Sequence, residues 1–99
     1  MRVTISSFAH SQREADICFA LSDPTRINIL HALERQPHNV NELTLELGIP
    51  QPMTSRHLRI LRERGLVQST RHGVSVTYAL SDARLIQALA LLNDISTRS

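Results

Sequence analysis

The sequence contains one cysteine, three glycines and no lysine, and these shortages already exclude several classes of protein. A lone cysteine, Cys18, cannot build an intrachain disulfide framework and is typical of a reducing compartment. No apolar run approaches the roughly 20 residues that span a bilayer, and the N-terminus lacks the apolar run of a signal peptide. We therefore expect a cytoplasmic protein without a membrane partner.

Catalytic motifs are lacking too. The chain shows no nucleophile elbow and no paired-carboxylate arrangement, and each glycine falls at the boundary of an expected element, which leaves none for a phosphate-binding loop. We expect neither an enzyme nor a bound cofactor.

The length of 99 residues fits one compact domain, and the chain contains no repeat, low-complexity stretch or linker. Residues 1–10 carry little pattern and are expected to fray. A core this small gains stability when further apolar surface is buried against a second copy of the chain, so a dimer is favoured.

The apolar spacing predicts four successive helices, at about residues 11–21, 24–36, 38–48 and 51–64. Ser22 or Asp23 is expected to cap the second helix and Asn41 the third, and Gly48 is expected to end the third in a left-handed conformation. Gly65 is expected to stop the fourth.

After Gly65 the apolar period changes from helical to alternating, which predicts a β-hairpin turning at His72-Gly73. Val74, Val76, Tyr78 and Leu80 alternate with polar or small residues. Ser81-Asp82 then precede a last helix, whose apolar stripe consists of Leu85, Ala88, Leu89, Leu92 and Ile95. The expected fold is mainly α with a β-hairpin wing, a winged helix-turn-helix of order α-α-α-α-β-β-α.

The basic residues are concentrated in one part of the chain. Although the formal net charge is only +2, five of the eleven arginines lie within sixteen residues: Arg56, Arg59, Arg62, Arg64 and Arg71. Such a cluster fits a phosphate-binding surface. It also fits a solvated helix face, because arginine is a good helix former. Charge alone leaves both interpretations open.

The helix-turn-helix pattern of residues 40–80 favours the first interpretation. A helix fits the major groove of B-DNA when its exposed side carries hydrogen-bonding groups. Gln51 can pair with adenine, Arg56 and Arg59 can reach guanine or phosphate, and Arg71 on the wing can contact the flanking backbone. The expected DNA-binding residues are Gln51, Thr54, Ser55, Arg56, His57, Arg59, Arg71 and His72. Thr54 also shares a predicted helix face with Leu58 and Leu61. A winged helix that binds only proteins, such as an antitoxin, is the alternative.

Several separated motifs in this sequence resemble the ArsR/SmtB family of bacterial repressors. They are Ala20-Leu21-Ser22-Asp23-Pro24-Thr25-Arg26 with Ile29-Leu30, Pro52-Met53-Thr54-Ser55-Arg56-His57-Leu58 with Leu61-Arg62, Gly65-Leu66-Val67, Arg71-His72-Gly73 and Tyr78-Ala79-Leu80-Ser81. The resemblance covers about residues 15–85. It implies a homodimer through the first and last helices that binds a palindromic operator on double-stranded DNA, represses transcription and is released by an inducer. The apolar stripes of residues 15–21 and 85–95 agree, because they exceed what one small core needs.

Many members of this family bind metal, but neither of the family's metal sites has its full set of ligands here. The resemblance places Asn39 and Asn41 where the thiolate site carries two cysteines, and asparagine supplies no sulfur. At the site on the last helix Asp82 matches, whereas Arg84 and Ile95 replace two ligands and the fourth position falls near Arg98. We expect no metal and interpret Asp82 as a helix-capping acid.

Cys18 is the remaining residue whose side chain could react. Its place on an apolar stripe predicts a buried, inert thiol. If the first helices meet across a two-fold axis, the two Cys18 thiols could instead form an intersubunit disulfide, which would make the protein a redox-responsive repressor. The inducer itself is not predicted by the sequence.

Overall fold

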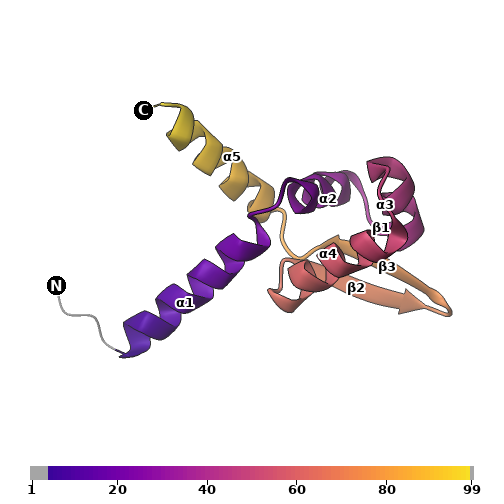
Figure 1. Cartoon of the computed structure of the whole chain (residues 1–99), viewed down its shortest axis with the longest axis horizontal. Coiled ribbons are helices and arrows are strands. Elements are labelled where there is room, and N and C mark those ends of the chain that lie inside the picture. Colours follow the sequence, from indigo (N-terminus) through magenta and orange to yellow (C-terminus); the bar gives the residue numbers. More distant parts are fainter. Residues whose placement is uncertain (1–4, 99) are drawn as a thin grey trace.

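The structure is a computed structural model, and it describes residues 5–98. Five helices and three short strands follow one another along the chain: α1 (Ile5–Ala20), α2 (Pro24–Arg35), β1 (His38–Asn39), α3 (Val40–Leu47), α4 (Gln51–Glu63), β2 (Val67–His72), β3 (Ser75–Leu80) and α5 (Arg84–Thr97). This order confirms the predicted winged helix-turn-helix and adds β1 to it (Figure 1).

Helix α2 begins where the sequence predicts, because Asp23 supplies its N-terminal cap. The Asp23 carboxylate accepts hydrogen bonds from the backbone N–H groups of Thr25 at 2.7 Å and Arg26 at 3.4 Å. Pro24 occupies the first turn, where its missing N–H costs no hydrogen bond. Of the two predicted caps, Ser22 and Asp23, the structure uses Asp23.

Three predicted boundaries are wrong. Helix α1 already includes residues 5–10, which were expected to fray, while residues 1–4 lie outside the described part. The cap of α3 is Asn39 rather than Asn41, since Asn39 and Glu42 form a reciprocal capping box. The hairpin turns at Gly73-Val74, one residue later than predicted, so Val74 lies exposed at the tip.

The sheet has the order β1-β3-β2 with antiparallel pairing throughout. In the hairpin Arg71 lies opposite Val76 and His72 opposite Ser75. Gly48 and Gly73 adopt positive φ angles of 67° and 63°, which glycine tolerates at helix ends and tight turns.

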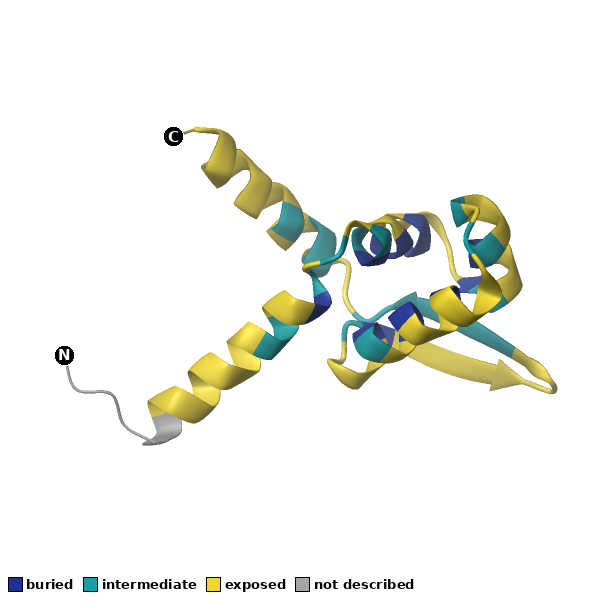
Figure 2. Cartoon of the chain, viewed as in Figure 1, coloured by how far each residue is buried: buried dark blue, intermediate teal, exposed yellow. Residues whose placement is uncertain are grey.

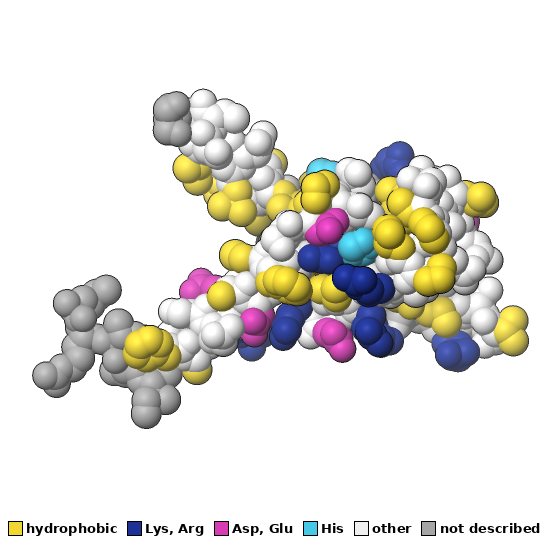
Figure 3. All heavy atoms as spheres, in the orientation of Figure 1, with side chains coloured by type: hydrophobic (Ala, Val, Ile, Leu, Met, Phe, Trp, Pro, Cys, Tyr) yellow, Lys and Arg dark blue, Asp and Glu magenta, His cyan; other side chains and the backbone are white. Residues whose placement is uncertain are grey.

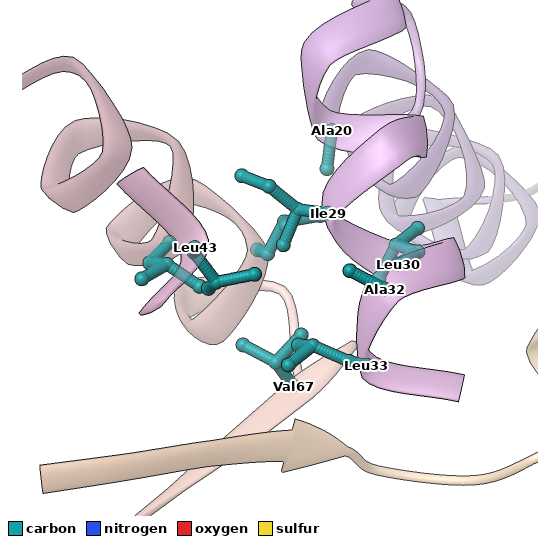
Figure 4. Close-up of a cluster of buried hydrophobic side chains, with 9 residues drawn as sticks. Ala20, Ile29, Leu30, Ala32, Leu33, Leu43 and Val67 are labelled. Atoms are coloured by element: carbon teal, nitrogen blue, oxygen red, sulfur yellow. The ribbon is translucent and has the colours of Figure 1, made fainter. Parts of the chain in front are cut away.

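The core lies where α2, α3, α4 and the start of β2 meet (Figure 4). Its buried apolar members are Ala20, Ile29, Leu30, Ala32, Leu33, Leu43, Leu58, Leu61 and Val67. Among the α1 residues whose burial is described, 7–20, only the last, Ala20, belongs to this core, and α5 adds partly buried side chains.

Helices α1 and α5 project from the rest of the chain and are mostly exposed (Figures 1 and 2). The radius of gyration is 15.3 Å, whereas a compact domain of about 100 residues has about 13 Å. The excess follows from these two projecting helices. Among the described residues, no helix is long and apolar enough to cross a membrane.

Candidate DNA interface

Helix α4 has a buried side and an exposed polar side. Leu58 and Leu61 are buried in the core, whereas Gln51, Arg56 and Arg59 are exposed. The helix begins at a Pro50-Gln51-Pro52 turn, in which the Pro50 carbonyl accepts hydrogen bonds from the N–H groups of residues 53 and 54. Its polar side therefore faces solvent along the whole length of the helix.

Two of the predicted DNA-binding residues, Thr54 and His57, lie on the buried side. Thr54 is completely buried: the Thr44 hydroxyl donates to its Oγ1 at 2.9 Å, and its own hydroxyl donates to the Pro50 carbonyl at 3.4 Å. His57 is 7% exposed, and its Nδ1 lies 3.0 Å from Arg26 Nη1. Because Thr54 is completely buried and His57 almost completely, we remove both from the candidate interface.

The remaining predicted residues lie on the exposed surface of α4 and the wing. They are Gln51, Ser55, Arg56, Arg59, Arg71 and His72. A groove of about 360 Å³ runs beside α4 and is lined by Pro52, Ser55, Arg56, Arg59, Arg62 and Tyr78.

The structure adds Arg62 and Tyr78 to the predicted set. Arg62 follows Arg56 and Arg59 at the same three-residue spacing, a signal that the sequence already contained. Tyr78 comes from β3, and nothing in the local sequence pairs it with α4.

The side chains of the arginines on this surface have no carboxylate partner among the described residues. Arg35, Arg64, Arg84 and Arg98 form ion pairs elsewhere on the chain. Among the arginines of residues 5–98, those whose side chains form neither an ion pair nor a hydrogen bond are Arg13, Arg56, Arg59, Arg62 and Arg71. Four of these five lie on α4 or the wing, and Figure 3 shows arginine side chains gathered over α4. Unneutralised positive charge is therefore concentrated at this surface.

Burial lowers the pKa of His57, and the nearby cations Arg26 and Arg56 lower it further, although the Asp23 carboxylate acts in the opposite direction. The neutral imidazole is therefore favoured at neutral pH.

The positions of the family's two metal sites do not fit a metal in this structure. Asn39 is occupied as a helix cap. Asp82 is held by Arg84, whose guanidinium donates to both carboxylate oxygens at 2.8 to 3.1 Å and whose backbone N–H donates to Oδ1 at 2.8 Å. The side-chain bonds, followed by the backbone bond, lower the pKa of Asp82 to about 2. Across residues 5–98, no group of three or more His, Cys, Asp or Glu side chains is arranged to hold a metal ion.

Cys18 differs from its prediction. The thiol is exposed on α1, not buried, because nothing in residues 5–98 of the single chain covers the position of Cys18 on its apolar stripe.

Comparison with known proteins agrees with this architecture. A family profile described as "Bacterial regulatory protein, arsR family" matches residues 23–69. The biofilm growth-associated repressor of Xylella fastidiosa is 33% identical over 81 residues, which cover 82% of this chain and 71% of that repressor. This chain belongs to the ArsR family. Membership in a family of regulatory proteins agrees with the prediction that the chain is not an enzyme.

Two further proteins are similar to this chain, one in sequence and one in fold. The HTH-type transcriptional repressor SmtB of Mycobacterium tuberculosis is 42% identical over 66 residues, which cover 67% of this chain. The match spans about half of that repressor's length, 49%. The homodimeric winged helix-turn-helix DNA-binding domain of a Mycobacterium bovis protein shares the fold, with a TM-score of 0.84 at 22% identity over 95% of this chain and 87% of that one.

Proposed function

We propose that this ArsR-family chain is a transcriptional repressor that binds double-stranded DNA as a homodimer at a palindromic operator. One observation supports the proposal above the others. The arginines of α4 and the wing have no carboxylate partner, so their charge is available for phosphate or base contacts. The relatives described as repressors favour the same function.

In this proposal the exposed side of α4 lies in the major groove. Gln51 at the start of the helix and Arg56 one and a half turns later read base edges, because glutamine pairs with adenine and arginine with guanine. Arg59 and Arg62 line the protein's surface groove together with Tyr78, and they bind the DNA phosphate backbone. On the wing, Arg71 and His72 contact the flanking phosphates.

The proposed dimer forms through α1 and α5. Both helices expose large apolar side chains in the single chain: Phe8, Phe19, Leu91, Leu92 and Ile95. Pairing of these faces would remove them from water and would place two copies of α4 about 34 Å apart, one turn of DNA. The homodimeric state of the Mycobacterium bovis domain favours this arrangement. We further propose the cytoplasm as the location, as expected for a DNA-binding regulator.

A salt titration with matched arginine variants tests the proposal. Duplexes are first selected by the protein from a random-sequence pool, and binding is then measured by fluorescence anisotropy. The logarithm of the association constant should fall with the logarithm of salt concentration by about 0.9 per phosphate contact. Arg56→Ala should weaken binding by about 1–3 kcal/mol and relax sequence preference.

The control is Arg98→Ala, which removes the same charge from the end of α5, where Arg98 pairs with Asp94. It should leave sequence preference unchanged. Equal effects of the two variants would contradict the groove assignment. If the protein selects no duplex from the pool, the alternative is favoured, namely a winged helix that binds proteins.

A further inference from the structure

Arg26 joins two helices that have different tasks in the proposed function. It is buried, with 5% of its surface exposed, and its guanidinium reaches partners on both helices. Nε donates to the Ala20 carbonyl at 2.7 Å and Nη2 to the Phe19 carbonyl at 3.2 Å, at the end of α1. Nη1 lies 3.0 Å from His57 Nδ1, in the middle of α4. One side chain of α2 therefore ties the end of α1 to α4.

The contact fixes the protonation state of His57. A guanidinium has donors only and stays charged, so Nδ1 of His57 must accept the hydrogen bond. The imidazole is then neutral and carries its proton on Nε2. A second proton would go to Nδ1 and would leave two donors and two cations facing each other at this distance. The link between Arg26 and His57 exists only while His57 is neutral.

We propose that Arg26 and His57 form a proton-sensitive clasp that positions α4 for DNA binding relative to the dimerising helix α1. The inference rests on the proposed function, which gives α1 the dimer interface and α4 the DNA. Protonation of His57 breaks the clasp, so acidification weakens DNA binding. Arg26 and His57 act as positioning residues, since neither reaches the surface that meets DNA.

The surroundings of His57 set the direction of this response. Asp23, next to α2, favours the imidazolium, whereas Arg26 from α2 and Arg56 from α4 oppose it. Burial has the largest effect and also opposes it, so the pKa of His57 lies below its usual value of 6.5. Because the unfolded chain takes up this proton at a higher pH than the folded chain, the contribution of the clasp to stability is complete above about pH 6.5 and declines as the pH falls below it.

The predicted loss of DNA affinity on acidification distinguishes the clasp from general electrostatic effects on DNA binding. DNA phosphates attract protons to any nearby histidine, and the positive charge that results tightens DNA binding at low pH. A loss of affinity on acidification requires a group whose protonation disturbs the protein itself.

The test compares the parent chain with His57→Asn and His31→Gln at constant ionic strength. The asparagine oxygen takes the place of Nδ1 as an acceptor and does not titrate. His31 is an exposed histidine on α2 and serves as the matched control. With a duplex selected at about pH 7.5, the parent and His31→Gln should bind more weakly at about pH 5.5, by less than about tenfold, the loss that one proton taken up at the ordinary histidine pKa of about 6.5 would cause. His57→Asn should lose this decrease. An identical pH response of the parent and His57→Asn would overturn the clasp.

Nitrogen NMR of the free parent chain decides the matter without DNA. The clasp predicts an unprotonated Nδ1 and a protonated Nε2 on His57 at about pH 7.5, with titration below the ordinary histidine pKa of about 6.5. A proton on Nδ1 at that pH would overturn it, including when His57→Asn fails to fold. If no duplex is selected at any pH, the proposed function is wrong. The NMR spectrum still tests whether Nδ1 of His57 accepts the hydrogen bond from Arg26.

Discussion

Leu92 lies on α5 with 59% of its surface exposed, so truncating it to alanine tests whether the projecting helices form the dimer. Complete burial of a leucine side chain stabilises by about 1.5–3 kcal/mol. Dimerisation can bury the part of Leu92 that is exposed in the single chain. Leu92→Ala should therefore remove about 1 kcal/mol of the free energy of dimerisation per copy. Two copies lose about 2 kcal/mol together, which weakens dimerisation about thirtyfold. Alanine is also the best helix former, so α5 itself should persist.

The assay is sedimentation equilibrium over a range of protein concentrations. The matched control is Leu45→Ala, because Leu45 is even more exposed, at 83%, but lies on α3. Leu45→Ala should leave the dimerisation constant unchanged. The reasoning is refuted if Leu92→Ala leaves that constant unchanged, or if both variants weaken it equally.

Three further predictions concern the wing, a helix end and the thiol. Arg71→Ala should weaken all duplexes about equally and reduce the salt slope by about 1, measured by anisotropy; a change in sequence preference instead would show that Arg71 reads bases. Gly48→Ala should lower the free energy of unfolding by about 1–2 kcal/mol in urea titrations, since Gly48 has a φ of 67° and open space around it; an unchanged midpoint would contradict the left-handed end of α3. Cys18→Ser should abolish any loss of DNA binding after peroxide treatment, because Cys18 is the exposed and only thiol of the chain; a response that persists in the variant would exclude the intersubunit disulfide.

Much of the fold could be predicted because its signals are local. Asp23-Pro24 marks the start of α2, Gly48 the end of α3, and the change of apolar period after Gly65 marks the hairpin. Strand β1 has no such signal, since its two residues become a strand only by pairing with Thr77 and Tyr78 far along the chain. The cap at Asn39 was predictable, because Glu42 follows three residues later as a capping box requires.

The candidate interface could be predicted only in part, because burial depends on partners that are distant in sequence. Thr54 shares the face of Leu58 and Leu61, so its spacing already indicated burial. His57 lies three residues after Thr54 on the same face, so spacing indicated its burial too, but not its hydrogen bond to Arg26, which lies 31 residues earlier. Cys18 was expected to be buried because its stripe is apolar, but no neighbour in the described part of a single chain covers it.

Methylation interference on a selected duplex tests most directly whether α4 reads the major groove. Methyl groups on guanine N7 lie in that groove and block an arginine from its acceptors. The account predicts interference at guanines in two patches about one helical turn apart, and loss of one of these signals in each patch with Arg56→Ala. Interference confined to adenine N3 in the minor groove, or a pattern that Arg56→Ala leaves unchanged, would contradict it.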